Sequence, residues 1–433
     1  MRILYVISGY GKEHIGFDIS TELAQEIIAR GHSYTIFAPA RRREMAGRTT
    51  DAVEEGVPVH REVCAGDAYL ELVNLLTQPL FKYAWFANVL WRLVLFLRRR
   101  PDFDLIYAEG AYPLGAIVYL ATRLSRRPFL VNVNGGDFIA NEQANYGYAR
   151  YRFARWMLRR VLDAAAAARA ESIYGAENAL RLGCAPSKLA LVQRNIGQMA
   201  FPAAGTDMAR YRAAAREQVY RRFQLAAPRL IIAVGRLLPI KGFDDLIRAL
   251  PAIRAGAGET QILHVGPNRI DTKFGDYRAY LENLARELGV ARLVTFAGQV
   301  DHVEVRDFLA AADVLAAPSV EEGGTKMVME AAAVGTPFVG TRSAGTPEWA
   351  RNWNCGLIVP PRAPEKLAEA LCRILSDPQS AQRMGANGLR FAEQFRTAEV
   401  ATRILGLCDC ALRGAAVPPE LKQPEPLLNP VQT

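Results

Sequence analysis

The sequence lacks paired cysteines and a recognisable secretory leader. The apolar run Ile3–Ile7 near the N-terminus is too short for the core of a signal peptide and has no small-residue cleavage site after it. No two cysteines form a CxxC pair, so neither a zinc site nor a disulfide framework is indicated. We therefore expect a cytoplasmic protein of a reducing compartment. The six cysteines are Cys64, Cys184, Cys355, Cys372, Cys408 and Cys410.

Long apolar runs are also missing. The aromatic segment Leu75–Leu97 has its strongest apolar part at Ala84–Leu97, which is interrupted by Asn88 and Arg92 and is shorter than the roughly 20 residues that a membrane-spanning helix needs. Its aromatic and basic residues, followed by Arg98–Arg100, leave two alternatives open. The segment is either a helix lying in the headgroup region of a membrane or a helix packed on the sheet of its own domain.

The charge balance predicts an anionic partner. The formal net charge is +9 and the sequence pI is about 9.3, which favours nucleic acid, anionic lipid headgroups or phosphorylated substrates. No nucleic-acid-binding motif accompanies the charge, so we expect no nucleic acid among the partners. An anionic membrane surface remains a candidate. The basic residues gather in the first half, at Arg41–Arg43, Arg98–Arg100, Arg126, Arg127, Arg150, Arg152, Arg155, Arg159 and Arg160.

The pattern of apolar runs predicts the fold class. A chain of 433 residues, half of them apolar, is too long for one compact core, so two domains are expected. Short β-rich runs alternate with helical patterns, which is typical of parallel sheets with crossover helices. We predict an α/β protein with two doubly wound domains. The predicted strands are Ile3–Ile7, Tyr34–Ala38, Asp104–Ala108, Phe129–Val133, Leu230–Val234, Gln261–Val265, Leu293–Ala297, Val314–Ala317, Pro337–Gly340 and Leu357–Val359.

Composition sets the expected domain boundaries. Residues 1–200 form the first domain, which the C-terminal helix 395–413 is expected to join. Residues 201–228, rich in Ala, Arg and Pro, are interpreted as a linker with a short helix, and residues 229–394 form the second domain. The tail 414–433 contains five prolines and little apolar periodicity, so we expect it to be disordered.

Two glutamates lie on either side of a glycine turn that joins a strand to a helix in the second domain. Glu322 follows the predicted strand Val314–Ala317, and Glu330 lies inside the predicted helix 326–334. The turn between them directs backbone N–H groups and the positive end of a helix dipole at one point, which favours a diphosphate. The two carboxylates could then reach opposite ends of one extended ligand. Alternatively, acidic residues at a helix start simply favour the helix dipole.

A second loop of the same domain carries two cations. Gly235 and Arg236 follow the strand Leu230–Val234, and Lys241 stands five residues beyond Arg236. Arginine supplies a planar fork of donors and lysine a mobile point charge. Because both side chains extend from one strand-to-helix loop, they would together bind a diphosphate and stabilise the charge that develops as the diphosphate leaves.

These blocks, in this order, resemble the retaining glycosyltransferases of the family-4 type, also called group 1, which have the two-domain GT-B fold. GRLLPIKGFDDLIRAL resembles the GR-x4-KG block of that family, HVGPN its glycine loop, and FAGQV with FLAAADVLAAPSVEEGG follows its order. EAAAVGTPFVGTRSAGTPEW, CGLIVPPRAPEKLAEAL and RMGANGLRFAEQF complete the pattern, and ELAQEIIARGHSYTIFA is similar to the first helix and second strand. The resemblance implies two Rossmann-like domains facing across a cleft.

The resemblance also implies roles for individual residues. Arg236 and Lys241 would hold the diphosphate of a nucleotide-sugar donor, Glu330 would accept hydrogen bonds from the ribose, and Glu322 would contact the transferred sugar. Glu322, Arg236 and Lys241 are the implied catalytic residues. No metal or other cofactor is expected, because in this family Arg and Lys replace a bound metal. The remaining implied donor-binding residues are Gly266, Gly323, Gly324 and Thr325.

Two positions depart from the family pattern. The usual pair of glycines before the first helix reads His14-Ile15-Gly16, so Gly16 is the position carried over. The usual His-Gly-x-Asp block reads Asn134-Gly135-Gly136-Asp137. Asparagine can donate and accept hydrogen bonds but cannot become charged. Asn134 either replaces the histidine near the donor or only caps the turn after the strand.

The function expected from the sequence is a retaining hexosyltransferase. It would move a sugar from a nucleotide-diphosphate sugar to a lipid-linked or polysaccharide acceptor, in cell-envelope polysaccharide synthesis, as a peripheral protein on the cytosolic face of the plasma membrane. Two alternatives stay open: a nucleotide-sugar epimerase on the same architecture, and a non-catalytic glycosyltransferase-like binding subunit. The epimerase would need acid/base groups around the sugar, and no cluster of His and carboxylates that would supply them is evident.

Overall fold

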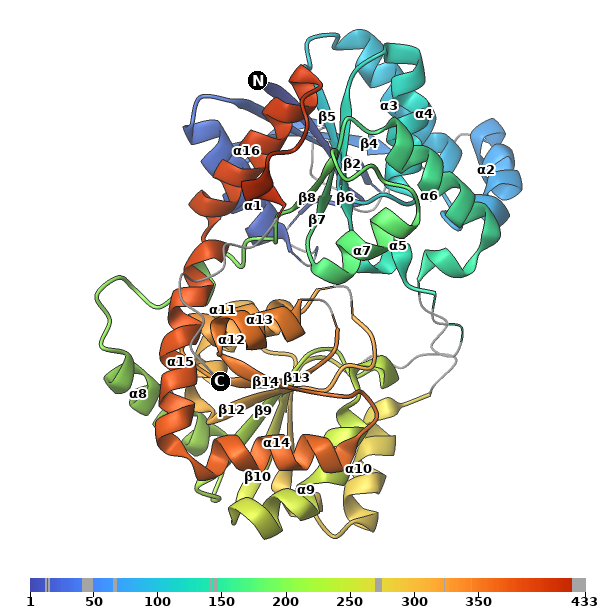
Figure 1. Cartoon of the computed structure of the whole chain (residues 1–433). Coiled ribbons are helices and arrows are strands. Elements are labelled where there is room, and N and C mark those ends of the chain that lie inside the picture. The colour runs from blue at the N-terminus through green and yellow to red at the C-terminus, as the bar shows by residue number, and fades with distance from the viewer. Residues whose placement is uncertain are drawn as a thin grey trace. The chain divides into compact units, whose positions relative to one another are not determined.

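The computed structural model describes residues 1–422 except 12, 13, 15, 41–49, 65–67, 141, 143–146, 269–274, 323 and 344. The chain divides into two compact α/β units (Figure 1). The first comprises Met1–Asn195 and the returning segment from Thr397, and the second comprises Ile196–Arg396.

The first unit is built on an eight-stranded sheet in the order β3-β4-β2-β1-β5-β6-β7-β8. All neighbours pair in parallel except β3 and β4, which pair antiparallel at one edge. The strands are β1 Arg2–Val6, β2 Ser33–Ala40, β3 Asp51–Glu54, β4 Val57–Val63, β5 Leu105–Ala108, β6 Phe129–Val133, β7 Ala167–Ala170 and β8 Leu189–Leu191. The helices are α1 Phe17–Ala29, α2 Ala68–Phe81, α3 Phe86–Arg99, α4 Leu114–Ser125, α5 Gly135–Phe138, α6 Arg152–Ala164, α7 Ile173–Arg181 and α16 Thr397–Arg413.

Alternation along the strands gives this sheet two separate cores. In β1, Leu4 and Val6 belong to the core covered by α3, α4 and α6, whereas Ile3 and Tyr5 belong to the core covered by α1 and α16. Successive side chains of a strand point to opposite faces, so a strand buried on both sides becomes a continuous apolar run. This is why β1, β5 and β6 could be predicted from the sequence.

The tail was expected to be disordered from Gly414 onward, and this is wrong for residues 414–422. Val417 donates its N–H to the carbonyl of Ser187 at 2.7 Å. Val417 and Leu421 are buried in the core beneath α1 and α16. Two apolar side chains with somewhere to pack therefore order a segment whose proline content suggested a coil. Residues 423–433 lie outside the described part of the chain.

The second unit is built on a six-stranded parallel sheet in the order β11-β10-β9-β12-β13-β14. This is the strand order of a doubly wound dinucleotide-binding fold. The strands are β9 Arg229–Val234, β10 Thr260–Val265, β11 Val294–Gly298, β12 Val314–Ala317, β13 Phe338–Thr341 and β14 Gly356–Val359. The helices are α8 Met208–Phe223, α9 Phe243–Ala257, α10 Tyr277–Glu287, α11 His302–Ala311, α12 Lys326–Ala333, α13 Thr346–Trp353, α14 Pro364–Ser376 and α15 Pro378–Ala392.

The predicted linker 201–228 is part of the second unit rather than a connection between domains. Phe201, Ala215 and Val219 are buried in a core that includes α11 and α12, and Arg212 of α8 donates to the carbonyl of Ala312 at 2.7 Å. The sequence patterning of α8 is dominated by charge, which concealed its buried stripe. The chain passes between the units at 195/196 and 396/397.

The aromatic segment between Leu75 and Leu97 forms the end of α2 and most of α3. Among the described residues, no single helix is long and apolar enough to cross a membrane; α2 and α3 pass such a test only as a pair, bent by 110°. The inner face of α3, including Val89, Leu93 and Phe96, is buried in the first unit. Of the two alternatives, packing on the domain's own sheet is therefore the one observed for α3.

Candidate active site

The predicted donor residues of the second unit follow two neighbouring strands, β9 and β12. These strands lie at the point where the strand order reverses, and ligands of doubly wound sheets bind beside the carboxyl ends of the strands at such a point. The loop after β9 carries Arg236 and Lys241, and the loop after β12 carries Glu322. The topology therefore brings together two loops that are about 80 residues apart in the sequence, as the separation of 81 between Lys241 and Glu322 shows.

An ion pair joins these two loops. Lys241 Nζ donates to Glu322 Oε1, and about one fifth of each side chain remains exposed. Ser319 Oγ donates to Glu322 Oε2 at 2.8 Å, so both carboxylate oxygens are held. The backbone adds a third link, because Val320 donates its N–H to the carbonyl of Ile240 at 2.8 Å. The structure thus places Lys241 and Glu322 together, in a fixed arrangement that remains open to a ligand.

Two glycines allow the loops to approach this closely. Gly242 has a φ of +66°, and a Cβ built on it would lie 2.1 Å from the carbonyl oxygen of Pro318 in the loop after β12. Gly266, in the loop after β10, has a φ of +147°, and its Cβ would lie 2.0 Å from the carbonyl oxygen of Gly235. A side chain at either position would push the loops apart. Gly266 is therefore required by the packing of the loops, whatever it contributes to a ligand.

Arg236 is exposed, and it makes no hydrogen bond or ion pair with the residues that the structure describes. Arg236 lies in the same loop as Lys241, but no hydrogen bond or ion pair joins it to Lys241 or Glu322. An unpaired guanidinium at the carboxyl edge of a sheet keeps all five of its donors for an anion.

The start of α12 carries the other donor residues that the sequence predicts. Thr325 is buried, and its hydroxyl has no hydrogen-bond partner among the described residues. Gly324 is exposed, and a Cβ there would meet nothing within 4 Å. The free N–H groups of the first helical turn and the dipole of the helix favour an anion at this end. Gly323 lies outside the described residues.

Glu330 lies one turn further along α12, in a charged cluster that the sequence did not reveal. Its Oε1 is 2.8 Å from Lys326 Nζ and 3.1 Å from His302 Nε2, which are themselves 2.7 Å apart. Burial raises the pKa of Glu330, but the opposing effect of Lys326 and His302 is larger, so that the pKa lies below its usual value. The second oxygen, Oε2, is buried without a partner in the described structure and can accept a hydrogen bond from a ligand hydroxyl.

The predicted residues of the first unit have mainly structural surroundings. Gly16 precedes α1 as its N-cap. Asn134 precedes α5, where its N–H donates to Asp137 Oδ2 at 3.3 Å, and its side-chain Nδ2 donates to the carbonyl of Glu109 at 2.5 Å. Asn134 thus caps the turn after β6 and ties it to the loop after β5. This was one of the two alternatives for Asn134, and its role toward a ligand remains a prediction.

The carboxyl edge of the first sheet also carries charged groups that were not predicted. Glu109 follows β5, and burial raises its pKa to about 7. Glu171 follows β7 and accepts from Arg194 Nε at 3.0 Å. Burial raises the pKa of Glu171, but Arg194 and Arg169 lower it to a value below the usual one. A charged residue directly after a buried strand is the signal that would have found these groups, because the carboxyl ends of parallel strands share one edge.

Comparison with known families gives this site its context. The sequence profile described as "Glycosyl transferases group 1" matches residues 219–391, and the profile described as "Glycosyl transferase 4-like domain" matches residues 19–195. The chain belongs to the group 1 glycosyltransferases. It is a nucleotide-sugar glycosyltransferase, as the resemblance of its motifs implied.

Two mycobacterial relatives of this glycosyltransferase are both named GDP-mannose-dependent alpha-(1-6)-phosphatidylinositol monomannoside mannosyltransferase. The protein of Mycolicibacterium smegmatis is 29% identical over 372 residues, which cover 84% of this chain and 87% of that protein. The protein of Mycobacterium tuberculosis is 29% identical over 296 residues, which cover 66% of this chain and 70% of that protein.

Solved structures confirm the fold class of the glycosyltransferase. Sucrose-phosphate synthase from Thermosynechococcus elongatus has a TM-score of 0.74 at 21% identity and covers 96% of this chain and 100% of that chain. Anabaena HepE in complex with UDP has a TM-score of 0.70 at 19% identity and covers 94% and 100%. At these identities the likeness shows the fold, which is GT-B.

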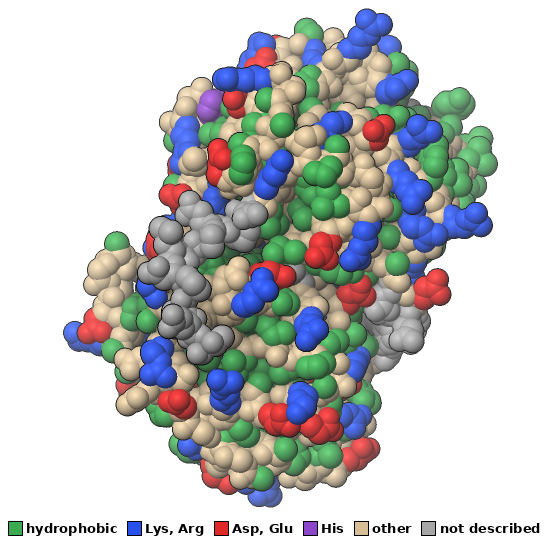
Figure 2. All heavy atoms as spheres, viewed as in Figure 1, with side chains coloured by type: hydrophobic (Ala, Val, Ile, Leu, Met, Phe, Trp, Pro, Cys, Tyr) green, Lys and Arg blue, Asp and Glu red, His purple; other side chains and the backbone are tan. Residues whose placement is uncertain are grey.

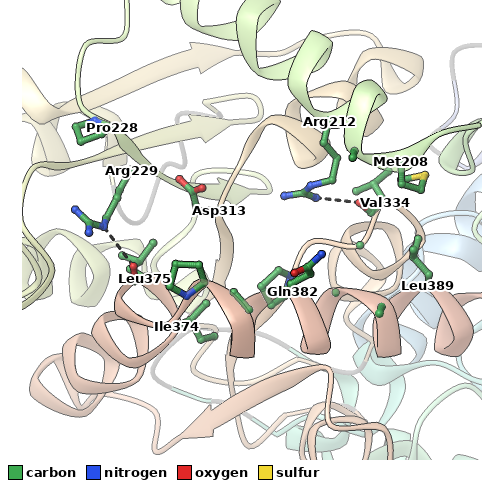
Figure 3. Close-up of a pocket in the computed structure, with 17 residues that line it drawn as sticks. Met208, Arg212, Pro228, Arg229, Asp313, Val334, Ile374, Leu375, Gln382 and Leu389 are labelled. Atoms are coloured by element: carbon green, nitrogen blue, oxygen red, sulfur yellow. Dashed lines mark hydrogen bonds between the residues drawn. The ribbon is translucent and has the colours of Figure 1, made fainter.

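A cavity of about 720 Å³ lies at the opposite edge of the second sheet from the predicted donor residues of the glycosyltransferase, beside the starts of β9, β12 and β13 (Figure 3). Three of its charged side chains are hydrogen-bonded within the protein. Arg212 donates to the carbonyl of Val334, and Arg229 to that of Leu375. Asp313 Oδ2 accepts the N–H of Leu230 at 2.7 Å. This cavity contains none of the predicted donor residues, and its hydrogen bonds join α8 to the residue after α12 and β9 to α14.

Metal ligands were not expected in the glycosyltransferase. Among the described residues, no group of three or more His, Cys, Asp or Glu side chains is arranged to hold a metal ion. Metal-independent chemistry remains a prediction that only an assay can test.

The contact between Gly242 and Pro318 predicts the effect of one methyl group. Gly242→Ala adds a Cβ that would stand 2.1 Å from Pro318 O, so the loops after β9 and β12 must separate. We expect a large loss of transfer activity and a lower midpoint of thermal unfolding.

Gly289→Ala is the matched control. Gly289 has a similar φ of +68° and open space around its Cβ position, so it carries only the cost of the left-handed conformation, about 1–2 kcal/mol. Equal activity in the two variants would show that the close approach of the loops does not matter.

Proposed function

We propose that the glycosyltransferase transfers a hexose from a nucleoside diphosphate sugar to a lipid-linked or saccharide acceptor with retention of the anomeric configuration, at the cytosolic face of the plasma membrane. The second unit binds the donor and the first unit binds the acceptor. The observation that carries the proposal is the meeting of Lys241 and Glu322 at the point where the strand order of the second sheet reverses.

Lys241 and Arg236 are suited to the diphosphate of the donor. Lys241 is partly exposed beside the loop after β12, and Arg236 has its donors free among the described residues. Cleavage of the anomeric bond leaves a doubly charged diphosphate and an oxocarbenium-like sugar, so stabilisation of the leaving anion is the largest requirement. Two cations and the amino end of α12 meet this requirement without a metal ion.

The two glutamates are suited to the hydroxyl groups at the two ends of the donor. Glu322 lies in the loop beside the cations, where it would contact the transferred sugar. Glu330 offers a buried, unpaired oxygen and an ionised carboxylate, which would accept hydrogen bonds from the ribose. The lowered pKa ensures that this acceptor stays charged at neutral pH.

Retention follows if the acceptor attacks from the face that the diphosphate leaves. The bond between the anomeric carbon and the phosphate oxygen breaks, and a bond to the acceptor oxygen forms on the same face. The departing phosphate oxygen takes the proton of the acceptor hydroxyl. Glu109, whose pKa of about 7 allows either protonation state near neutrality, is a further polar group at the edge of the acceptor unit.

The relatives suggest which donor and acceptor to test first. The two mycobacterial relatives are named for GDP-mannose and for a phosphatidylinositol mannoside. GDP-mannose is therefore the first donor and a glycosylated phospholipid the first acceptor. A net charge of +9 is compatible with acceptors that carry phosphate. Such an acceptor would place the enzyme in the synthesis of cell-envelope glycolipids or polysaccharides.

A panel of nucleotide sugars tests the reaction class. We expect release of the nucleoside diphosphate that depends on the acceptor, no requirement for added metal, and a product whose anomeric proton shows retention by NMR. An epimerase would convert the sugar without releasing the diphosphate, and a binding subunit would bind the donor without converting it. Either result would replace the proposed function.

Removal of Arg236 tests the anion site without disturbing the fold. Because Arg236 is exposed and unpaired in the described structure, Arg236→Ala should leave thermal unfolding unchanged. We expect kcat/KM to fall by about 100-fold to 1,000-fold, the usual effect of losing one group that stabilises a developing anion. Arg248→Ala, which removes an exposed arginine from α9, is the control. Full activity of Arg236→Ala would exclude Arg236 from the site.

Replacement of Lys326 tests the role of Glu330 through pH. In the wild type, the lowered pKa keeps Glu330 ionised well below neutrality. The affinity of the wild-type enzyme for nucleotide should therefore depend little on the titration of Glu330. Lys326→Met removes the first of the two groups that lower this pKa, so the pKa rises and Glu330 takes up a proton as the pH falls. We expect the nucleoside diphosphate affinity of Lys326→Met, measured by calorimetry, to fall from about pH 8 to about pH 6 by more than that of the wild type.

Lys366→Met is the control for this titration. Lys366 also pairs with a glutamate on its own helix, Glu369, but both side chains are more than half exposed. Any pH dependence in the Lys366→Met variant therefore reports the titration of the ligand itself. If Lys326→Met and Lys366→Met showed the same pH profile, Glu330 would have no part in nucleotide binding.

A further inference from the structure

One helix of the first unit has its apolar face outward. On α2 the large side chains of Tyr69, Leu72, Leu75, Leu76 and Leu80 are 74%, 58%, 66%, 70% and 46% exposed. They recur at the three- and four-residue spacing that places side chains on one side of a helix. Figure 2 shows hydrophobic side chains gathered on this edge of the first unit, over α2 as placed in Figure 1. A contiguous apolar face of this kind marks an interaction surface.

Hydrogen bonds on the inner side fix α2 in this orientation. Asn74 is 6% exposed; its Nδ2 donates to Asn88 Oδ1 at 3.0 Å, and its Oδ1 accepts the N–H of Ala87 at 2.9 Å. Asn88 Nδ2 in turn donates to the carbonyl of Cys64 at 2.6 Å. Rotating α2 to bury its leucines would leave these buried polar groups without partners. The amphipathic helix is thus reversed, with amides inside and leucines outside.

Aromatic and basic residues of α6 continue this surface. Phe81, at the end of α2, contacts Phe153 with ring centroids 5.1 Å apart, and Phe153 contacts Trp156 at 5.6 Å. Trp156 is 49% exposed, and the guanidinium of Arg160 lies 5.7 Å from its ring. Phe81 thus leads from the leucines of α2 to an exposed tryptophan beside a cation.

The charge around the leucines is mostly of one sign. Exposed cations stand at Lys82, directly after α2, and along α6 at Arg152, Arg159 and Arg160. None of the four has an ion pair with a carboxylate in the described part of the chain. The acidic residue of α2 is Glu71. The predicted basic cluster Arg41–Arg43 lies outside the described residues. Lys and Arg side chains lie beside the hydrophobic ones in Figure 2.

We propose that α2 inserts its leucine face into the headgroup and acyl boundary of an anionic lipid surface, while Lys82 and the arginines of α6 contact the lipid phosphates. This inference rests on the membrane location in the proposed function, and it names the element and the lipid chemistry responsible. A helix with apolar residues on one side, Trp and Tyr at its borders and cations beside them is suited to an interfacial position rather than to crossing the membrane.

The structure divides the segment Leu75–Leu97, which the sequence offered as a membrane-surface helix, between α2 and α3. Its strongest apolar part, Ala84–Leu97, lies mostly in α3, which buries its apolar face, whereas Leu75, Leu76 and Leu80 lie in α2 and are exposed. A second copy of the chain is the other occupant to consider, and four unpaired cations would then face four cations across a two-fold interface, which is unfavourable.

Vesicle flotation of the full chain tests the proposal. The vesicles contain phosphatidylcholine alone or phosphatidylcholine mixed with phosphatidylserine. We expect the wild type to float with the mixed vesicles, and Leu72→Ser/Leu76→Ser to reduce this partition at least about tenfold, since two exposed leucines no longer enter the lipid. Arg159→Gln/Arg160→Gln should reduce the preference for anionic vesicles by about fivefold for each charge.

Leu124→Ser/Leu180→Ser is the matched control, because it removes two exposed leucines from α4 and α7 of the same unit. It should float like the wild type. All variants should unfold at the wild-type temperature and transfer sugar to a soluble acceptor, so loss of flotation and failure of the transfer reaction are separate results. Equal flotation of all variants, no flotation of the wild type, or a dimer that Leu72→Ser/Leu76→Ser abolishes would overturn the proposal.

Discussion

The candidate site depends on the ion pair between Lys241 and Glu322. It joins the loops after two neighbouring strands, and the N–H of Val320 and the glycine at position 242 hold the same loops in contact. Because Ser319 holds the second carboxylate oxygen, the orientation of Glu322 is fixed from both sides. A rigid arrangement of charges at the edge of a sheet loses little entropy when a ligand arrives, which is the condition for effective electrostatic stabilisation.

The two units use charge in opposite ways. In the second unit, Arg236 is left unpaired among the described residues and the amino end of α12 adds positive potential, so the edge favours an anion. In the first unit, Arg194 is paired with Glu171, and Glu109 has a raised pKa because of burial. The carboxyl edge of the second sheet is thus the one suited to the diphosphate of the proposed donor.

The helices α2 and α3 show how one apolar stretch of sequence can serve two purposes. They are separated by a sharp bend of 110°, after which α3 buries its face in the sheet and α2 leaves its face outside. The direction of α2 is set by Asn74 and Asn88, which are polar residues that need partners in the interior. Hydrophobicity alone would assign both helices to the core, and the buried amides decide which one is exposed.

Local pattern determined much of this protein from the sequence. Continuous apolar runs specified the buried strands β1, β5, β6 and β9, and glycines between strand and helix marked the loops that carry Arg236, Lys241 and Glu322. These features could be predicted because strand burial and turn conformation depend on neighbouring residues. The strand β7, Ala-Ala-Arg-Ala, was missed because alanine favours helices, and the packing of the sheet overrides that preference.

Only the tertiary structure decided which charges meet. Lys241 and Glu322 are 81 residues apart, and His302 reaches Glu330 from another helix; no local pattern encodes either contact. The same holds for the outward face of α2, for α8 as part of the second unit, and for Val417 and Leu421 in the core of the first. The sequence fixes which residues are able to pair or pack, but strand order and the demand of every buried polar group for a partner select the ones that do.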